Sequence, residues 1–325
     1  MNRIPISARL FVCLLLIANP FVSAHEGIHA EEAAPSIDGF TFLENVDIAK
    51  EIENPEPIFL YEYRSCGLLV RCEIIFPEKS GSGNYEILVA CHGSTGGLSD
   101  RIRIKGEELA KKGYLVVMPT YRGEGGSEGE IEVAKGEVDD VLACIDLLST
   151  SGLCSSGSIA LIGSSHGALV AALAAARNPD ISAVVCAYGV LDIVGWWYYL
   201  NETGQYEENE LSKRIYGGGP LDHPDEFAIR SAIKFACDIK SPIFIVQGSA
   251  DTLVPPSQSE SFRDALERCG NSNYKYKLYD GIGHGFLWWN EKDRRKKGDE
   301  AVDTAFEAWD DILDFINESR SGMTD

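Results

Sequence analysis

The sequence predicts an α/β fold with a mostly parallel sheet of the eight-stranded type and helices on both of its faces. Short apolar runs that contain few polar residues are typical of strands buried on both faces. Segments of helical period lie between these runs, so that strand, helix and strand alternate along most of the chain. The 325 residues, 45% of them hydrophobic, are enough for one large domain or two smaller ones.

The individual elements follow from this patterning in chain order. The expected strands are β-rich runs at Ile58–Tyr63, Leu68–Phe76, Glu86–Cys91, Tyr114–Met118, Ser158–Ile162, Val184–Tyr188, Pro242–Val246 and Tyr274–Tyr279. The expected helices lie at Ile102–Lys112, Val133–Leu148, Ala168–Ala176, Gln258–Cys269 and Thr304–Ile316. Because alanine has the highest helix propensity, the alanine-rich run is the strongest helix former among them.

One long stretch, at about residues 193–238, interrupts the alternation. It separates two expected strands and is longer than a single crossover helix requires. It begins near the aromatic run Trp196-Trp197-Tyr198-Tyr199 and contains consecutive glycines at 217–219. We interpret it as an insertion, a cap over the sheet edge ahead of the strand at Pro242–Val246. Its aromatic side chains either line a pocket or fill core.

The first 24 residues have the order of a secretory signal peptide. Arg3 and Arg9 are followed by an apolar run at Leu10–Ile17, and Ala24 is a small residue ahead of a polar segment. A membrane span needs about 20 apolar residues, so the length of the run disfavours an uncleaved anchor. We expect cleavage after Ala24, export to the periplasm or the medium, and no membrane association afterwards.

The exported chain is expected to consist of an N-terminal arm at 25–55 and one folded domain at 56–320 that includes the insertion. It has 50 acidic and 29 basic residues, a net charge of −21 before cleavage. Such a chain lacks the basic surface that nucleic acids require and is repelled by anionic membranes. The expected partners are small molecules or short peptides, and the oligomeric state is left open.

The cysteines are expected to meet an oxidising compartment after export. Cys91 and Cys186 lie inside apolar strand-like runs, so we interpret them as buried thiols. Six others lie nearer to element ends and can form disulfides whose connectivity the sequence leaves open: Cys66, Cys72, Cys144, Cys154, Cys237 and Cys269. Neither a metal-binding cluster nor a cofactor is predicted.

A candidate nucleophile lies between an expected strand and the alanine-rich helix. Residues 163–167, Gly-Ser-Ser-His-Gly, fit the pattern G-x-S-x-G with Ser165 at the centre, in the strand–turn–helix context that the pattern requires. The sharp turn leaves room only for small neighbours and holds the serine hydroxyl clear of the sheet. A helix N-terminus also favours the negative charge that develops there.

A serine hydroxyl needs a base to remove its proton, and His284 is the best-placed of the six histidines. It lies in a glycine-rich loop at 281–286, directly after the last expected strand. The group that orients the histidine is predicted to be Asp251, because it follows an apolar strand at the edge where α/β sheets place reactive groups. Asp192 also follows a strand and is the competing candidate, whereas Asp280 is interpreted as a turn residue.

The remaining requirement is an oxyanion hole, two backbone N–H groups aimed at the oxygen of a tetrahedral intermediate. The amide of His166, the residue after the nucleophile, is one expected donor. The other is expected from the glycine-rich loop at 91–97, where we choose the amide of Ser94. The alternative interpretation of this loop is an ordinary glycine-rich turn.

Taken together, these motifs resemble those of a known family. The order HGS at 92–94, YRG at 121–123, GSSHG, GSAD at 248–251 and GIGHGF at 281–286 is similar to the catalytic domain of the prolyl oligopeptidase family and to dienelactone hydrolases. The likeness covers about residues 58–318 and includes DEFAIRSA at 225–232. It implies an α/β-hydrolase fold and a serine triad at Ser165, Asp251 and His284.

The sequence departs from both groups in ways that bear on the substrate. Dienelactone hydrolases use a cysteine nucleophile where this chain has Ser165, and the oligopeptidases carry an N-terminal β-propeller that the short arm here cannot form. We therefore expect a secreted serine hydrolase that cleaves carboxylic esters through an acyl-enzyme. The alternatives are a serine peptidase acting on short peptides and an inactive hydrolase scaffold that serves as a binding protein.

Overall fold

A computed structural model describes residues 34–46, 56–78, 84–205 and 210–321. The chain from Pro35 onward is one compact unit. The predicted signal peptide and its cleavage site after Ala24 lie outside the described residues, as does part of the predicted arm.

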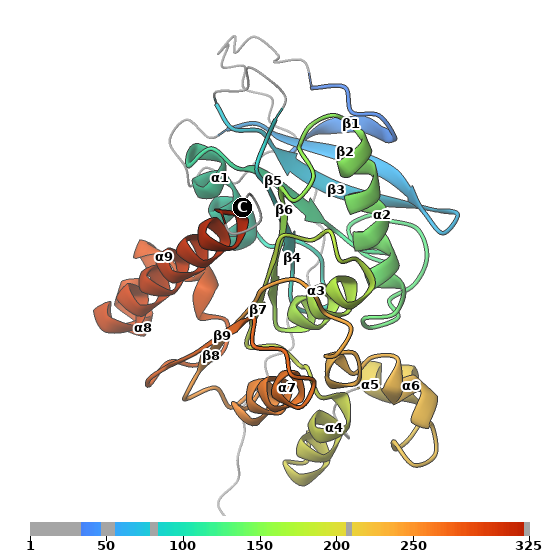
Figure 1. Cartoon of the computed structure of the whole chain (residues 1–325), viewed down its shortest axis with the longest axis vertical. Coiled ribbons are helices and arrows are strands. Elements are labelled where there is room, and N and C mark those ends of the chain that lie inside the picture. Colours follow the sequence, from blue (N-terminus) through green and yellow to red (C-terminus); the bar gives the residue numbers. More distant parts are fainter. Residues whose placement is uncertain (1–33, 47–55, 79–83, 206–209, 322–325) are drawn as a thin grey trace, which may run out of the picture. The chain divides into compact units, whose positions relative to one another are not determined.

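The described residues form a nine-stranded sheet in the order β1-β2-β3-β5-β4-β6-β7-β8-β9 (Figure 1). The strands are β1 (Phe40–Val46), β2 (Ile58–Ser65), β3 (Leu68–Ile75), β4 (Ile87–Cys91), β5 (Leu115–Pro119), β6 (Ile159–Ser164), β7 (Ala183–Ala187), β8 (Ile243–Gly248) and β9 (Tyr274–Tyr279). Pairing is antiparallel from β1 to β5 and parallel from β5 to β9. The carboxyl ends of the parallel strands therefore share one edge of the sheet.

Helices cover both faces of the sheet. They are α1 (Asp100–Lys111), α2 (Gly136–Thr150), α3 (His166–Arg177), α4 (Ile193–Glu202), α5 (Glu210–Tyr216), α6 (Pro224–Ala228), α7 (Ser257–Arg268), α8 (Arg294–Lys297) and α9 (Asp299–Ser321), with short 3₁₀ helices η1 (Ala232–Lys234), η2 (Phe286–Trp288) and η3 (Glu291–Asp293). Figure 1 shows α1 and α9 on one face and α2 and α3 on the other. Every residue of β4, β5 and β7 is buried because both faces are covered.

The fold class predicted from the sequence is confirmed, but some of its elements differ from those expected. The helix expected at Val133–Leu148 begins at Gly136, because Val133 and Ala134 have a positive φ and cannot continue a right-handed helix. The sheet has nine strands rather than eight, because residues 40–46, which were assigned to a polar arm, form β1 and pair with β2. Only Phe40 of β1 is buried, and a bulge between Phe42 and Glu44 breaks the alternation that would have indicated a strand. The predicted insertion between β7 and β8 contains α4, α5, α6 and η1.

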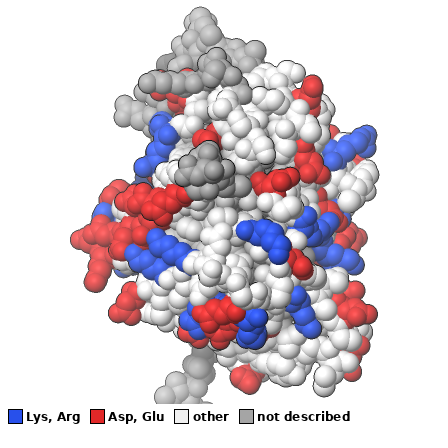
Figure 2. Space-filling model, viewed as in Figure 1, with Lys and Arg blue, Asp and Glu red and all other residues white. Residues whose placement is uncertain are grey.

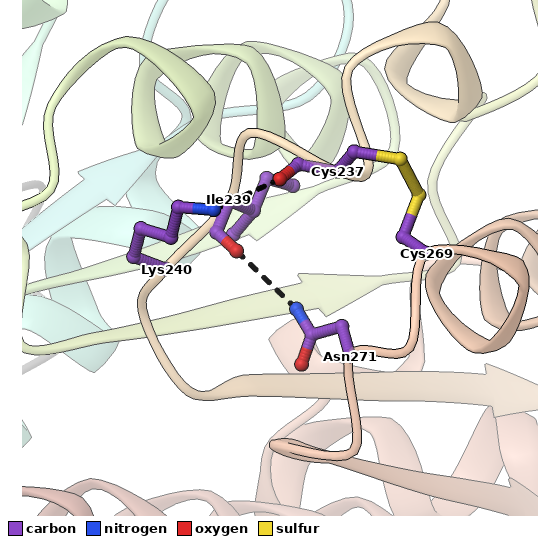
Figure 3. Close-up of a disulfide and its surroundings, with 5 residues drawn as sticks. All are labelled: Cys237, Ile239, Lys240, Cys269 and Asn271. Atoms are coloured by element: carbon purple, nitrogen blue, oxygen red, sulfur yellow. Dashed lines mark hydrogen bonds between the residues drawn. A yellow bond between two sulfur atoms is a disulfide. The ribbon is translucent and has the colours of Figure 1, made fainter.

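A disulfide between Cys237 and Cys269 ties the end of the insertion to the end of α7 (Figure 3). Beside it, the amide nitrogen of Asn271 donates to the carbonyl of Ile239, 3.3 Å away, and Lys240 Nζ donates to the carbonyl of Cys237. The sequence separation is 32 residues, and a loop of that length implies a stabilisation of about 3–4 kcal/mol through the unfolded state. The closed loop contains β8 and the segment that carries Asp251.

The other cysteines that the structure describes are free thiols. Cys91 and Cys186 are buried, which confirms the interpretation made from their apolar surroundings. Of the six candidates for pairing, Cys66, Cys72, Cys144 and Cys154 remain unpaired. Two cysteines join only when their Cα atoms come close, and the value of 5.0 Å for the bonded pair depends on tertiary packing.

Charged side chains of both signs occur together on the surface. On the described residues of the face shown in Figure 2, lysines and arginines lie among acidic side chains and form no broad basic area. Within the described ranges, no helix is both long enough and apolar enough to cross a membrane. The same ranges contain no group of three or more His, Cys, Asp or Glu residues placed to hold a metal ion.

Candidate active site

Ser165 lies in a strained turn between the end of β6 and the start of α3. Its φ of 54° is unfavourable for a residue with a side chain, and such strain occurs mainly at functional sites. A Cβ atom at Gly163 would come within 2.3 Å of the carbonyl oxygen of Gly167, and one at Gly167 within 2.0 Å of that of Cys91. The two glycines of the motif are therefore required by close backbone packing.

His284 lies between Ser165 and Asp251 and joins them in one chain of hydrogen bonds. Its Nε2 is 3.1 Å from Ser165 Oγ, and its Nδ1 is 2.7 Å from Asp251 Oδ2. The Asp251 carboxylate is buried, and its other oxygen accepts the N–H groups of Leu253 and Val254. Because this carboxylate accepts the Nδ1 proton, Nε2 of the neutral ring is free to accept a proton from the serine.

The loops after β8 and β9 bring the acid and the base together. Ala250 N–H donates to the carbonyl of Ile282 at 3.0 Å, so the two loops share a backbone hydrogen bond. A Cβ at Gly248 would lie 2.3 Å from that same carbonyl oxygen, which explains the glycine at the end of β8. The ring of Tyr188 packs edge-on against His284 at a centroid distance of 4.8 Å and fixes the position of the imidazole.

The two alternative aspartates have other partners. Asp192 is the N-cap of α4, where its side chain accepts the N–H of Gly195 at 3.0 Å. Asp280 accepts the hydroxyl of Ser249 at 2.9 Å. The structure thus brings Asp251, and neither alternative, into contact with His284.

Ser94 and His166, the two expected oxyanion donors, line the same pocket as Ser165. Ser94 has a φ of 63°, in the left-handed region, within the loop that follows β4. A Cβ at Gly93 would lie 3.0 Å from Ser165 Cβ and 2.9 Å from the carbonyl oxygen of Ser164, so this loop packs directly against the nucleophile. The loop is therefore placed where the second donor is required.

The pocket beside Ser165 has a volume of about 240 Å³ and a mainly apolar wall. It is lined by Ser94, Thr95, Val133, Ser165, His166, Leu169, Val190, Ile193, Trp196, Tyr216, Leu253 and Val254. None of these described lining residues is acidic, lysine or arginine, and burial lowers the pKa of His166 to about 4, which leaves its ring neutral at pH 7. Such a pocket suits an uncharged, apolar group.

The insertion contributes to this pocket and to the core. Trp196 lines the pocket, while the half-buried ring of Trp197 packs against the buried Phe227 at a centroid distance of 6.4 Å. The pocket interpretation therefore holds for Trp196, and none of the four aromatic side chains of the run is fully buried. A larger hollow of about 470 Å³ lies at the opposite edge of the sheet, next to Ile181 and Asn273, and contains none of the reactive residues.

A buried carboxylate, Glu124, packs against the glycine-rich loop at 91–97, which we call the oxyanion loop. Its Oε2 accepts the N–H of Gly97 and lies 3.7 Å from Nε2 of His92. His92 stacks on Tyr121 at 4.2 Å, and its Nδ1 is 3.0 Å from the carbonyl of Gly93. Burial raises the pKa of Glu124 to about 7 and lowers that of His92 to about 4.

Replacing Glu124 by glutamine is expected to stabilise the protein above pH 7. The pKa of this carboxyl falls from about 7 to its ordinary value near 4.5 on unfolding, so the protonated form stabilises the fold below pH 4.5 and that contribution is lost as the pH rises through 7. Glutamine is uncharged and retains an oxygen for the Gly97 N–H. We expect the variant to gain on the order of 1–3 kcal/mol over wild type at pH 8 and much less at pH 5.

Denaturant unfolding at both pH values measures this difference. Glu130→Gln serves as the matched control, because Glu130 is exposed and its loss should leave the pH dependence unchanged. A stability difference for Glu124→Gln that is the same at pH 5 and pH 8 would contradict the assignment of a raised pKa to Glu124.

The comparison with known families agrees with this geometry. Residues 104–306, more than half of the chain, match the prolyl oligopeptidase family. The chain belongs to the prolyl oligopeptidase family. This confirms the resemblance drawn from the motifs, and serine hydrolase is the class of enzyme that the family and the site both indicate.

Two curated relatives illustrate the range of this family. Acylamino-acid-releasing enzyme 2 from Oryza sativa subsp. japonica is 27% identical over an alignment of 221 positions, and the alignment covers 61% of this chain and 27% of that protein. The uncharacterized peptidase YtmA from Bacillus subtilis (strain 168) is 25% identical over 162 residues, 50% of this chain and 61% of that protein. The chain thus matches 27% and 61% of the lengths of these relatives.

Solved structures show the same fold at lower identity. A Mycobacterium tuberculosis puromycin-hydrolyzing peptidase aligns with a TM-score of 0.61 and 22% identity, covering 73% of this chain and 37% of the other. A putative dienelactone hydrolase from Klebsiella pneumoniae subsp. pneumoniae MGH 78578 aligns with a TM-score of 0.57 and 21% identity, covering 80% and 98%. Both alignments confirm the predicted α/β-hydrolase fold.

Proposed function

We propose that this chain is a serine hydrolase of the peptidase type, which cleaves short peptides or acyl amides next to an uncharged apolar group. The observation that carries the proposal is the hydrogen-bonded chain from Ser165 through His284 to Asp251, at the wall of an uncharged apolar pocket. Ser165 is the nucleophile, His284 is the general base and Asp251 orients the imidazole.

The proposed reaction follows from the positions of these atoms. Ser165 Oγ attacks the carbonyl carbon while its proton moves to His284 Nε2, and Asp251 stabilises the imidazolium that forms. The N–H groups of Ser94 and His166 stabilise the charge on the tetrahedral oxygen. His284 then gives the proton to the leaving amine, and a water molecule that it deprotonates hydrolyses the acyl-enzyme.

An amide substrate becomes the first candidate in place of the ester expected from the sequence. The curated relatives include proteins named as a peptidase and as acylamino-acid-releasing enzymes. A carboxylic ester remains the second candidate, because the chain also aligns with 98% of a putative dienelactone hydrolase from Klebsiella pneumoniae. The same triad serves both reactions, so the leaving group has to be identified by experiment.

Matched substrates that share one acyl group are expected to separate the candidates. We expect purified protein to cleave N-acetyl-leucyl p-nitroanilide as well as the corresponding p-nitrophenyl ester. Exchanging leucyl for aspartyl is expected to lower kcat/KM by on the order of 100-fold, because a charge is costly in an uncharged pocket. Initial rates over both leaving groups and both acyl groups provide the measurement.

The outcomes distinguish the functions clearly. Turnover of the ester without the anilide would assign the chain to the esterases. Silence on both substrates from folded protein would favour an inactive scaffold that binds its ligand. Equal rates for leucyl and aspartyl substrates would contradict the role given to the apolar pocket.

We further propose that the protein is exported through the segment at residues 1–24. The Cys237–Cys269 disulfide supports this, because such bonds persist mainly in oxidising compartments, and Cys237 is exposed to the solvent. N-terminal sequencing of protein recovered outside the cytoplasm should begin at His25. Recovery in the cytoplasm with Met1 retained and both thiols reduced would overturn the proposal.

A further inference from the structure

A strained turn at residues 132–135 forms part of the wall of the pocket beside Ser165. Val133 and Ala134 both have a φ of 55°, in the left-handed region. For a β-branched residue such as Val133 this conformation is a genuine outlier and costs free energy. Val133 lines the pocket, so the strain is located where a substrate would bind.

The side chain of Glu137 binds the backbone N–H groups of the turn at 132–135. Glu137 is fully buried at the start of α2. One carboxylate oxygen accepts the N–H of Glu132 at 2.7 Å and that of Val133 at 2.9 Å. The other oxygen accepts the N–H of Lys135 at 3.1 Å. Three backbone donors of one short turn thus converge on a single buried carboxylate, which is a strong arrangement.

Arg230, a residue of the insertion, binds the backbone carbonyl groups of the same turn. Its Nε donates to the carbonyls of Val133 at 2.8 Å and Glu132 at 3.1 Å, and its Nη2 donates to that of Glu132 at 2.9 Å. Its Nη1 donates to the carbonyl and the carboxylate of Glu226 in α6. Arg230 is only 3% exposed, so these bonds are shielded from water.

The two charged side chains bind the turn together, and we call this arrangement of Glu137 and Arg230 the clamp. At the Glu132–Val133 peptide, Glu137 accepts the N–H while Arg230 donates to the C=O. A carboxylate satisfies the N–H groups and a guanidinium satisfies the C=O groups, and this pairing offsets the cost of the left-handed conformation. Neither group contacts Ser165, His284 or Asp251 in the described hydrogen bonds. The clamp therefore acts on the shape of the pocket rather than on the reacting atoms.

We propose that Val133 determines which acyl groups the pocket accepts, and that Glu137 and Arg230 are positioning residues that hold it there. The inference deepens the proposed function and rests on it. Arg230 belongs to the insertion and also contacts Glu226 of α6. The insertion therefore sets the size of the pocket beside Ser165 through this turn.

Val133→Ala tests the specificity role most directly. Alanine removes two methyl groups from the pocket wall and tolerates a positive φ better than valine, so the variant should fold. Activated p-nitrophenyl esters of N-acetyl-alanine, leucine, phenylalanine and tryptophan report acyl preference for an esterase and for a peptidase alike. We expect the ratio of kcat/KM for tryptophyl over alanyl substrates to rise by on the order of 10-fold.

Arg230→Met tests the clamp, with Arg230→Lys as the conservative variant. Arg177→Met is the matched control, because it also removes a guanidinium and an ion pair, with Asp139, but at the surface. We expect Arg230→Met to flatten the acyl preference by raising KM for the preferred substrate while changing kcat little. Arg230→Lys should restore part of the preference, and Arg177→Met should leave it intact.

Reaction with a small alkyl fluorophosphonate separates the failure of this inference from failure of the proposed function. The reagent reports the competence of Ser165 without filling the pocket. Normal labelling of Val133→Ala with an unchanged preference would overturn the inference alone, and so would a folded Arg230→Met variant that keeps the wild-type preference. Wild-type protein that neither reacts nor turns over any ester would overturn both. If Arg230→Met does not fold, Val133→Ala decides.

Discussion

Asp251→Asn is expected to lower kcat/KM about 10⁴-fold without unfolding the protein. The Asp251 carboxylate accepts the Nδ1 proton of His284, which leaves Nε2 bare toward Ser165. An asparagine amide that donates to Nδ1 instead would place the ring proton on Nε2, where it blocks proton transfer from the serine. The asparagine oxygen can still accept the N–H groups of Leu253 and Val254, so the local structure should persist.

Asp192→Asn is the matched control for this variant. Asp192 also follows a strand, but it caps α4, and asparagine is as good an N-cap as aspartate. We expect kcat/KM of this variant to stay within about threefold of wild type, with thermal unfolding as the check on folding in both cases. A collapse of activity in Asp192→Asn, with Asp251→Asn tolerated, would show that the acid has been assigned to the wrong residue.

Ser165→Ala has an equally large expected effect, a loss of 10⁴-fold or more in kcat, because no other group can form the acyl-enzyme. Ser164→Ala is the natural control, since Ser164 is the adjacent serine. Its hydroxyl accepts the Trp288 indole N–H at 3.2 Å, and losing that bond should cost activity less than about tenfold. Steady-state rates on the better substrate of the matched pair measure both. Equal losses in the two variants would argue against a special role for Ser165.

The core of the fold could be predicted because its signals are local. The strands from β4 to β8 are buried and mostly apolar, as expected for parallel strands that are covered on both faces. The turn at Ser165 was equally readable, because a side chain at Gly163 or Gly167 would overlap neighbouring backbone. Close backbone packing of this kind requires glycine at fixed positions, and the sequence shows those glycines.

Elements that form through contacts with distant parts of the chain show no such local pattern in the sequence. Strand β1 has a single buried residue, Phe40, and exists because it pairs with β2. The helices of the insertion were not placed, because that stretch shows aromatic runs and glycines rather than a clear helical period. The disulfide partner of Cys237 likewise depends on where α7 ends in space.

Some residues of the site could likewise be predicted from local sequence patterns, and others could not. Ser165, His284 and Asp251 are predicted from motif and strand order, and the structure adds that the competing Asp192 is the N-cap of α4. Glu124 was not identified, because a glutamate among glycines is usual for an exposed turn and here it is buried beneath the oxyanion loop.

Val133 was missed for a different reason. The sequence placed it at the start of a helix, whereas α2 begins at Gly136 and residues 133 and 134 adopt the left-handed conformation ahead of it. A valine carries no local signal for that conformation. The buried side chains of Glu137 and Arg230, which are distant from each other in sequence, hold the turn in that conformation.

Active-site labelling tests whether Ser165 is a nucleophile activated by His284 and Asp251 more directly than any rate on a chosen substrate does. Wild-type protein, Ser165→Ala and Asp251→Asn are treated with a fluorophosphonate, and intact mass and peptide mapping identify the modified residue. We predict one phosphonyl group per chain on Ser165 in the wild type, none in Ser165→Ala and strongly slowed labelling in Asp251→Asn. Modification of another serine, or equal labelling of Ser165→Ala, would show that Ser165 is not the activated nucleophile.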